Sequence, residues 1–453
     1  MILQKVLFHN NLNYLIEHYM NDGTGFEEAA EKSAARIKGA NAVVVMCNDQ
    51  PDKIVAFRTG NAGGVLIGYG DNEMLVASDI PAILGYTNTI SHLLPGELAV
   101  LHPNSVQFKD QDGNPIKKEK TFVPNDPISI AKGDYRHFML KEICEQPDAI
   151  IASLMGRLSS EEGLFSLEDL NLTADDINKI SKVTLTGMGT SLHAAMLARL
   201  WMERIAGIPS EWDNSSEFRY REPLLDENSL FISISQSGET ADTLAAMEEA
   251  KKKNISQITL CNYSNTQASR IADQTLQIRA GLEIGVAATK TFTCSLVTLY
   301  ALAIYLGVQR EKINGKEAAK LIEELFRLPE MIGTVLANQG QYEELATLYH
   351  SSSDFLFLGR GYNYPIALEG ALKLKEVSYI HAEGYPAGEM KHGPISLIDE
   401  SMPVVALVPK DELYEKMMNT INEAKSRGAI VIAVASESDT EIEQKVDHVI
   451  RIP

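Results

Sequence analysis

The second half of the chain repeats itself, and this internal repeat limits the possible folds more than any other feature. The segment VTLTGMG at 183–189 recurs as FLFLGRG at 355–361, an offset of 172 positions. Three more strand-like segments recur in the same order: 230–236 as 404–409, 256–262 as 429–435, and 273–279 as 447–453. Apolar runs followed by amphipathic stretches are typical of βαβ units in a parallel sheet. Four repeated strands therefore predict two similar α/β domains in tandem.

The front of the chain has a different pattern. Short strand-like runs separated by Gly, Asn, Asp and Pro are found at 42–46, 53–58, 64–68, 74–77, 97–101 and 105–109. Helical patterns fill the rest of this segment poorly. We therefore expect a layered antiparallel domain over roughly the first 130 residues.

The first repeat copy continues after Arg279 through a loop and a long apolar helix ending near Val308. No counterpart follows Pro453, so the second copy is expected to lack this closing helix unless a partner subunit supplies one. The apolar stretch Thr293–Val308 carries several hydroxyls and is predicted to be too short to span a bilayer.

The net charge of −20 disfavours nucleic acid and membrane surfaces as partners, because both carry negative charge. The four cysteines, Cys47, Cys144, Cys261 and Cys294, lack the spacing of a disulfide framework or a zinc site. The opening segment, MILQKVLFHNNLNYLIEHYM, does not resemble a signal peptide, so the cytoplasm is the expected location. No metal and no cofactor are expected.

Two predicted helices begin with clusters of hydroxyl side chains. In Gly187–Ile205, GMGTSLHAAMLARLWMERI, Thr190 or Ser191 can cap a helix after a tight glycine turn. In Ser233–Thr243, SISQSGETADT, four side chains that can donate hydrogen bonds to a phosphate precede the next helix: Ser235, Gln236, Ser237 and Thr240. Mere capping is the alternative, but two such starts at the carboxyl ends of strands in one sheet favour a shared crevice for a phosphorylated small molecule.

A third segment, predicted as a helix from Pro365 to about Glu383, carries charge on one face. Glu369, Lys373 and Glu376 lie within about 60° of one another, flanked by apolar positions. This is either an ordinary surface ion pair or a tuned proton-transfer group. The following GYPAGEMKHGP, 384–394, is predicted as a glycine-rich loop that presents His392, either a solvated side chain or a general acid or base.

Together these segments resemble the glutamine–fructose-6-phosphate aminotransferase (isomerizing) family, the glucosamine-6-phosphate synthases. The matching motifs are GTS at 189–191, SEFRYR at 216–221, SQSGETADTL at 235–244, EIGVAATKTFT at 283–293, LGRGYNYPIALEGALKLKEVSYIHAE at 358–383 and GEMKHGP at 388–394. YRHFMLKEICEQP at 135–147 resembles the family's interdomain linker. The resemblance runs from about Leu15 onward.

The resemblance implies an α/β fold with two tandem sugar-isomerase (SIS) domains. These would be doubly wound, flavodoxin-like parallel sheets behind an incomplete Ntn-type α+β glutamine amidotransferase domain. The implied boundaries are 1–130 for the partial amidotransferase domain, 131–165 for a linker, 166–312 for the first SIS domain, 313–345 for linking helices and 346–453 for the second SIS domain.

The resemblance also implies roles for individual residues. The sugar phosphate would be held by Thr190, Ser191, Ser235, Gln236, Ser237 and Thr240. Glu376 would move the proton between C1 and C2, His392 would assist ring opening, reaching into a neighbouring subunit, and Lys373 would be a supporting cation. Ala288 stands in VAATK where the family often has a serine that contacts a sugar hydroxyl.

Two departures from the family pattern shape the expected activity. The family's amidotransferase half begins with a nucleophilic cysteine that is absent here, so Asp79, which matches an acidic residue that binds glutamine's amino group, is expected to be a remnant. The carboxyl tail with the lysine that forms an imine with the sugar is also absent. We therefore expect fructose 6-phosphate or glucosamine 6-phosphate binding by a homodimer, no glutamine hydrolysis, and impaired use of ammonia.

Two other functions remain open at this stage. One is a non-catalytic sugar-phosphate-binding protein or regulatory decoy that dimerises with an intact enzyme. The other is an SIS isomerase or deglycase for a related phosphosugar amine.

Overall fold

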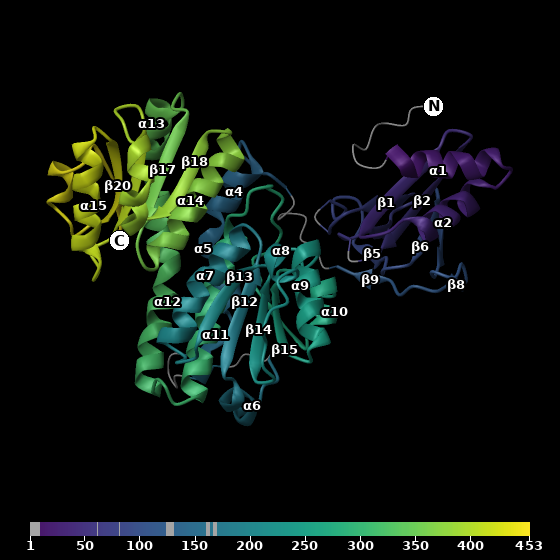
Figure 1. Ribbon diagram of the computed structural model, residues 1–453, viewed down its shortest axis with the longest axis horizontal. Helices are drawn as coiled ribbons and strands as arrows, with labels where there is room; N and C mark the ends of the chain where they lie inside the picture. The colour runs from purple at the N-terminus through teal and green to yellow at the C-terminus, as the bar shows by residue number, and fades with distance from the viewer. Residues whose placement is uncertain (1–9, 61, 81, 124–130, 160–163, 166–169) are drawn as a thin grey trace. The chain divides into compact units, whose positions relative to one another are not determined.

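The computed structural model describes residues 10–60, 62–80, 82–123, 131–159, 164–165 and 170–453 (Figure 1). The opening segment MILQKVLFH, from which we expected no signal peptide, lies outside the described residues. The chain forms two compact units, one of Met1–Gly133 with Glu239–Ala245 and one of Asp134–Gly238 with Ala246–Pro453.

The first unit contains two antiparallel sheets, of strand order β1-β2-β6-β7-β8 and β4-β3-β5-β9. Their strands are β1 (Asn41–Cys47), β2 (Gln50–Thr59), β3 (Leu66–Tyr69), β4 (Met74–Ala77), β5 (Thr89–His92), β6 (Leu98–His102), β7 (Ser105–Lys109), β8 (Pro115–Ile116) and β9 (Thr121–Phe122). All six predicted strands are confirmed. The strands β5, β8 and β9 were not predicted. This antiparallel region is consistent with a partial Ntn-type domain.

The expectation of few helices in this unit was wrong. Helices α1 (Asn10–Asn21) and α2 (Phe26–Arg36) precede the first strand. In α2, Phe26, Ala29 and Ala30 recur at helical spacing, and all three are buried in a core shared with β2 and β6. Small alanines among charged residues make a weak apolar stripe, which is why the periodicity was overlooked.

The second unit contains two five-stranded parallel sheets, of order β13-β12-β14-β15-β16 and β18-β17-β19-β20-β21. Their strands are β12 (Lys182–Gly187), β13 (Ser210–Asn214), β14 (Ser229–Ile234), β15 (Ser256–Cys261), β16 (Gln274–Gln277), β17 (Asp354–Gly359), β18 (His381–Pro386), β19 (Pro403–Val408), β20 (Ile430–Ser436) and β21 (His448–Ile452). The four repeated segments occupy equivalent places in the two sheets, which confirms the tandem α/β prediction. The edge strands β13 and β18 were not predicted.

The helices after Gly133 connect and cover these sheets (Figure 1). They are α4 (Phe138–Cys144), α5 (Gln146–Leu154), α6 (Ala174–Lys179), α7 (Thr190–Arg204), α8 (Ser215–Phe218), α9 (Ala241–Lys252), α10 (Gln267–Ile271), α11 (Lys290–Gln309), α12 (Gly315–Leu336), α13 (Gln339–Tyr349), α14 (Asn363–Ser378) and α15 (Tyr414–Ser426). Short 3-10 turns follow at η1 (Ala387–His392), η2 (Pro394–Leu397) and η3 (Ile442–Gln444), and a small hairpin pairs β10 (Leu158–Ser159) with β11 (Leu164–Phe165).

Helix α11 is the predicted apolar helix, and the argument that it is too short for a bilayer was wrong. It has 20 residues, and by length and composition it could cross a membrane. However, 67% of its apolar window is buried inside the unit, and Leu299, Leu302 and Ile304 belong to the core of the first parallel sheet. The burial identifies α11 as a core helix.

The predicted helix Pro365–Glu383 ends earlier than expected. Tyr379, with φ of 62°, adopts the left-handed conformation and terminates α14. The next residues, from His381, pair in parallel with β17 from Asp354 onward, and this edge strand is followed by η1 rather than by an open loop. A short polar strand that lacks alternating apolar residues is defined by its pairing, so it was invisible in the sequence.

Candidate functional site

The first hydroxyl-rich segment forms the turn between β12 and α7. Gly189, with φ of 52°, precedes the helix, and no side chain caps it. Gly187 permits the tight turn, because a Cβ there would lie 2.7 Å from the backbone carbon of Ser191. The interpretation of Thr190 or Ser191 as the helix cap was therefore wrong, and the hydroxyl of Thr190 is directed elsewhere.

Thr190 belongs to a polar cluster that joins α7 to α14, and so links the two parallel-sheet domains. We call Thr190, His193, Glu369, Lys373 and Glu376 the α7–α14 cluster. The carboxylate of Glu369 accepts hydrogen bonds from Thr190 Oγ1 at 2.9 Å and pairs with His193 Nδ1 at 2.6 Å. Lys373 Nζ lies 3.4 Å from Glu369 Oε1, 2.5 Å from Glu376 Oε2 and 3.2 Å from Thr190 Oγ1.

The two carboxylates of this cluster differ in their exposure to solvent. The side chain of Glu369 is 7% exposed, whereas that of Glu376 is 34% exposed. A buried carboxylate with this many partners is suited to hold the two helices in position. The more accessible carboxylate of Glu376 is suited to exchange a proton with a bound molecule. On this face of α14, Glu369 is buried and Glu376 lies at the exposed end.

His193 was not among the predicted site residues. His193 follows Thr190 by three positions, so both side chains lie on one face of α7. That spacing was the available signal. What it could not reveal was the partner Glu369, which lies 176 positions away in the chain.

The second hydroxyl-rich segment follows β14, the neighbour of β12 in the sheet. The two strands run parallel with Thr186 opposite Ser233, so their following loops leave the same edge of the sheet. Ser235 is buried and its Oγ accepts a hydrogen bond from the backbone N–H of Gly238 at 3.0 Å, while the carbonyl of Gln236 accepts one from Asn262 at 3.0 Å. Ser235 and Gln236 thus sit in a fixed loop at this sheet edge.

The remaining residues of this segment are more accessible. Ser237 is half-buried and Thr240 is exposed. Thr240 lies in the stretch Glu239–Ala245, which is grouped with the other compact unit. A phosphate contact by Thr240 stays a prediction.

Ala288 lies half-buried in the loop before α11, and a buried glutamate organises this loop. Glu283 accepts hydrogen bonds from the backbone N–H of Thr289 at 2.8 Å and from its hydroxyl at 3.1 Å, and it also accepts one from the Thr291 hydroxyl. Only 5% of Glu283 is exposed. The loop within the EIGVAATKTFT motif is therefore held in place by hydrogen bonds to the buried carboxylate of Glu283, the first residue of the motif.

The linker helices α4 and α5 fix the same loop from outside. Glu142 of α4 accepts hydrogen bonds from the backbone N–H groups of Ile284 at 2.5 Å and Gly285 at 3.0 Å. Burial raises the pKa of Glu142 even though these two hydrogen bonds act to lower it. Lys290, itself buried, pairs with Glu145 at 2.7 Å. The linker motif was recognisable in the sequence, but these contacts were not predicted.

Of the predicted site residues, Thr190, Lys373 and Glu376 belong to the α7–α14 cluster, whereas His392 and Asp79 are placed elsewhere. His392 is exposed at the end of η1. Asp79 lies in the first unit, where its carboxylate closes a turn by accepting hydrogen bonds from Ala82 N–H at 3.0 Å and from Ser78 Oγ at 3.2 Å. Within the described part of the chain, no group of three His, Cys, Asp or Glu side chains is arranged to hold a metal ion.

Comparisons with known proteins agree with this architecture. A family model described as the SIS domain matches residues 176–305 and 348–453, one range for each parallel sheet. The glutamine–fructose-6-phosphate aminotransferase (isomerizing) of Symbiobacterium thermophilum is 43% identical over 425 residues, which is 94% of this chain and 70% of that protein. The corresponding protein of Aquifex aeolicus is 44% identical over 427 residues, 94% of this chain and 69% of that protein.

A solved structure extends the likeness to the fold. The C-terminal domain of glucosamine-fructose-6-phosphate aminotransferase from Francisella tularensis superimposes with a TM-score of 0.68 at 38% identity. The match covers 71% of this chain and 90% of that one.

Proposed function

Since the chain belongs to the glutamine–fructose-6-phosphate aminotransferase family, we propose that it binds fructose 6-phosphate at the carboxyl edge of β12 and β14 and acts in the formation of glucosamine 6-phosphate. The α7–α14 cluster carries this proposal. Thr190, at the start of the predicted phosphate-binding helix, is hydrogen-bonded to Glu369 of the helix that also carries Glu376. A phosphate held at the start of α7 would place its sugar close to that helix.

In this proposal the two hydroxyl-rich segments hold the phosphate. The residues are Thr190, Ser191, Ser235, Gln236, Ser237 and Thr240, with Ala288 beside the sugar. Ammonia would replace the C2 carbonyl oxygen as water, and Glu376 would then move a proton from C1 to C2. Lys373, which is ion-paired with both Glu369 and Glu376, would serve as a cation beside the developing negative charge. His392 would assist ring opening from a neighbouring subunit.

Calorimetry on a double variant tests the phosphate site. Replacing Ser235→Ala together with Ser237→Ala should weaken fructose 6-phosphate binding by about tenfold or more, because hydrogen bonds to a charged group contribute about 1.5–3 kcal/mol each. Thr347→Ala is a matched control, since it removes an exposed hydroxyl on α13 that bonds only to its own helix. Equal affinity in the double variant would rule out this site.

The proton-transfer role of Glu376 is tested by isotope exchange. Glu376→Gln should abolish exchange of the C1 proton of bound sugar phosphate with deuterium oxide while leaving its binding nearly unchanged. Glu344→Gln on α13 changes the same charge at an exposed position and should leave exchange intact. Exchange that persists in Glu376→Gln would assign the base to another residue.

We also propose that the four thiols of this chain do not hydrolyse glutamine. Cys261 and Cys294 are buried, and burial raises the pKa of Cys294 to about 12, which keeps it as the weakly nucleophilic thiol. Cys47 ends a strand, and Cys144 ends the linker helix α4. Glutamate release by the pure chain should equal the blank. Release that thiol alkylation abolishes would contradict the proposal.

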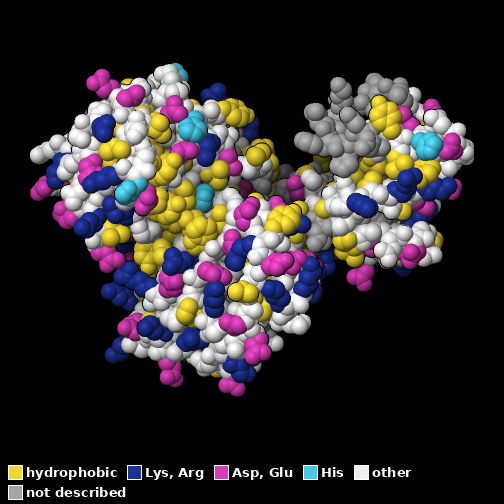
Figure 2. All heavy atoms as spheres, in the orientation of Figure 1, with side chains coloured by type: hydrophobic (Ala, Val, Ile, Leu, Met, Phe, Trp, Pro, Cys, Tyr) yellow, Lys and Arg dark blue, Asp and Glu magenta, His cyan; other side chains and the backbone are white. Residues whose placement is uncertain are grey.

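Assembly into a homodimer is proposed from the surface of the second unit. Hydrophobic side chains gather on its face around α12 and α14 (Figure 2), and Phe326, Val377, Tyr379 and Leu397 are exposed, with Tyr379 93% accessible. Patches of this kind commonly mark protein interfaces. Sedimentation should show a dimer that Tyr379→Asp weakens, whereas Tyr220→Asp, at an exposed position on the first SIS domain, should leave it intact.

The predicted domain boundaries, 1–130, 131–165, 166–312, 313–345 and 346–453, are part of the proposal. They are supported by the compact unit that reaches Gly133 and by the two ranges of the SIS model. Cytoplasmic location is likewise proposed, and the burial of α11 in the core of the first SIS domain supports it.

A further inference from the structure

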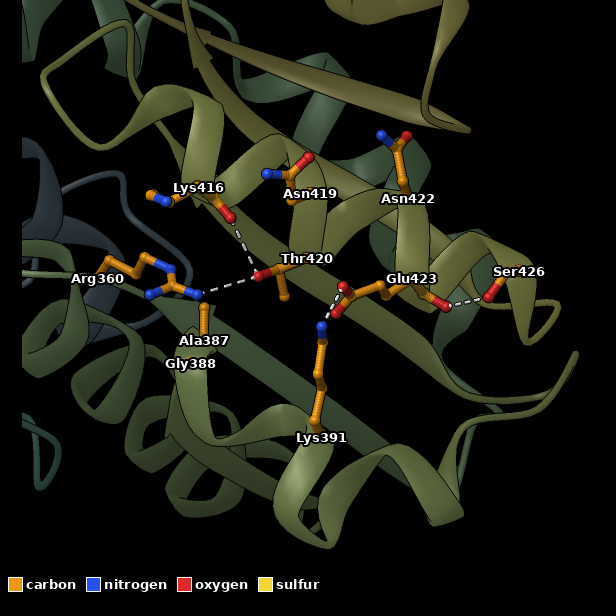
Figure 3. A pocket seen from close by; sticks show the side chains of 10 residues that line it. All are labelled: Arg360, Ala387, Gly388, Lys391, Lys416, Asn419, Thr420, Asn422, Glu423 and Ser426. Atoms are coloured by element: carbon orange, nitrogen blue, oxygen red, sulfur yellow. Dashed lines mark hydrogen bonds and ion pairs between the residues drawn. The ribbon is translucent and has the colours of Figure 1, made fainter.

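A pocket of about 510 Å³ lies in the second SIS domain between η1 and α15, apart from the site described above (Figure 3). We call it the η1–α15 pocket. It is lined chiefly by Arg360, Gly388 and Lys391 on one side and by Lys416, Asn419 and Glu423 of α15 on the other. The three α15 positions lie on one face of the helix, spaced three and four residues apart, so the pocket follows the helix axis.

The charge of this pocket is opposite to that of the whole protein. Arg360, Lys391 and Lys416 place three cations around it, against the single carboxylate of Glu423. Glu423 is engaged by Lys391 at 2.6 Å. In a chain of net charge −20, such a local excess of positive charge favours an anionic ligand.

Arg360 has hydrogen-bonding capacity that the described residues do not use. Its Nη2 donates a long hydrogen bond of 3.4 Å to Thr420 Oγ1, and its Nε is buried without an acceptor among those residues (Figure 3). Buried donors are nearly always paired, so the guanidinium of Arg360, which lines the pocket, keeps unused capacity to donate to an anionic ligand. Gly388 leaves room at the guanidinium, because a Cβ there would lie 3.2 Å from Arg360 Nη1.

The remaining lining groups narrow the chemistry of the ligand. Asn419 and Asn422 add exposed amides that suit the hydroxyl groups of a sugar, whereas the buried Thr420 hydroxyl is already bonded to the Lys416 carbonyl and to Arg360. None of the residues that line the pocket is aromatic, so no surface is offered on which a nucleobase could stack. We propose that the η1–α15 pocket is a second binding site, which takes a phosphorylated sugar or polyol. This site is distinct from the phosphate site proposed at the carboxyl edge of β12 and β14.

Calorimetry on the full chain with fructose 6-phosphate, and separately with inorganic phosphate and with fructose, tests the proposal. We expect two binding events for the sugar phosphate, one lost with Ser235→Ala and Ser237→Ala and one weakened about tenfold by Lys416→Gln. Glu423→Gln should tighten the second event severalfold, because it removes the only carboxylate and frees Lys391. Misfolding could not produce such a gain.

Lys445→Gln, which removes an exposed lysine outside the pocket, is the charge-matched control and should change neither event. The proposal is overturned if the Ser235 and Ser237 double variant abolishes all binding, or if Lys416→Gln and Glu423→Gln both leave the titration unchanged. Fructose that binds the second site as tightly as fructose 6-phosphate would also overturn it. If the Ser235 and Ser237 double variant leaves both binding events unchanged, that result would count against the proposed active site and not against this pocket.

Discussion

Removing the imidazole of His193 should uncouple the two SIS domains at a measurable free-energy cost. His193 Nδ1 lies 2.6 Å from Glu369 Oε2, and these side chains are 13% and 7% exposed. In His193→Leu, Glu369 retains Thr190 Oγ1 at 2.9 Å and Lys373 Nζ at 3.4 Å. Glu369 thus loses one of its three partners, so we expect the free energy of unfolding to fall by about 2 kcal/mol, within the range for a hydrogen bond to a charged group. His193→Asn, which keeps a nitrogen donor near Nδ1, should lose less than about 1 kcal/mol.

A double-mutant cycle isolates the pair. Glu369→Met removes the carboxylate, and in the double variant neither buried group lacks its partner, so we expect a coupling free energy of about 1.5 kcal/mol. Urea unfolding followed by tryptophan fluorescence measures it, because both tryptophans, Trp201 and Trp212, lie in the first SIS domain. Trp201 is on α7 itself, in edge contact with Tyr300 at 5.1 Å. A coupling below about 0.5 kcal/mol would refute the assignment of this pair as an interdomain contact.

Three further outcomes are expected. Cys294, with its pKa raised to about 12 by burial, should resist iodoacetamide in the native protein while half-buried Cys47 reacts, and mass spectrometry showing equal labelling would contradict this. Gly238→Ala should destabilise the protein by about 1 kcal/mol or more and weaken fructose 6-phosphate binding, because φ is 67° and the new Cβ would lie 2.4 Å from Thr266 Oγ1; Gly333→Ala, in open space on α12, should instead be neutral or stabilising in the same urea titration. Burial raises the pKa of Glu142, so the folded protein binds a proton there more readily than the unfolded chain does. The free energy of unfolding of the wild type should therefore rise relative to that of Glu142→Gln as the pH falls through the raised pKa. A stability difference that does not change with pH would contradict the raised pKa.

Much of the second unit could be predicted from the sequence because its signals are local. An apolar strand, a glycine turn and an amphipathic helix each occupy a window of a few residues, and their recurrence after 172 positions defines two equivalent sheets. The hydroxyl-rich segments were likewise visible, because a strand and the loop after it are continuous in the chain. Parallel pairing of β12 with β14 then brings those loops to one edge.

Elements without a local signal were missed for a physical reason. The strand His381–Pro386 contains few apolar residues and exists because it pairs with β17, so its sequence continued the predicted helix. The stretch at Thr293–Val308 had the composition of either a membrane or a core helix, and only its burial among Leu299, Leu302 and Ile304 distinguishes the two.

By itself, then, the sequence determined the tandem α/β architecture, the family and the residues available for phosphate and proton chemistry, since motif and periodicity are properties of neighbouring positions. Only the tertiary structure decided which of these residues meet. Thr190 was predicted to cap its helix or to hold a phosphate, yet its hydroxyl bonds to Glu369, and the partner of His193 lies 176 positions away in the chain. The unpaired Nε of Arg360 beside the η1–α15 pocket is also a product of packing. Contacts of this kind depend on how α7 packs on α14 and how η1 packs on α15, and no local window of sequence contains both partners.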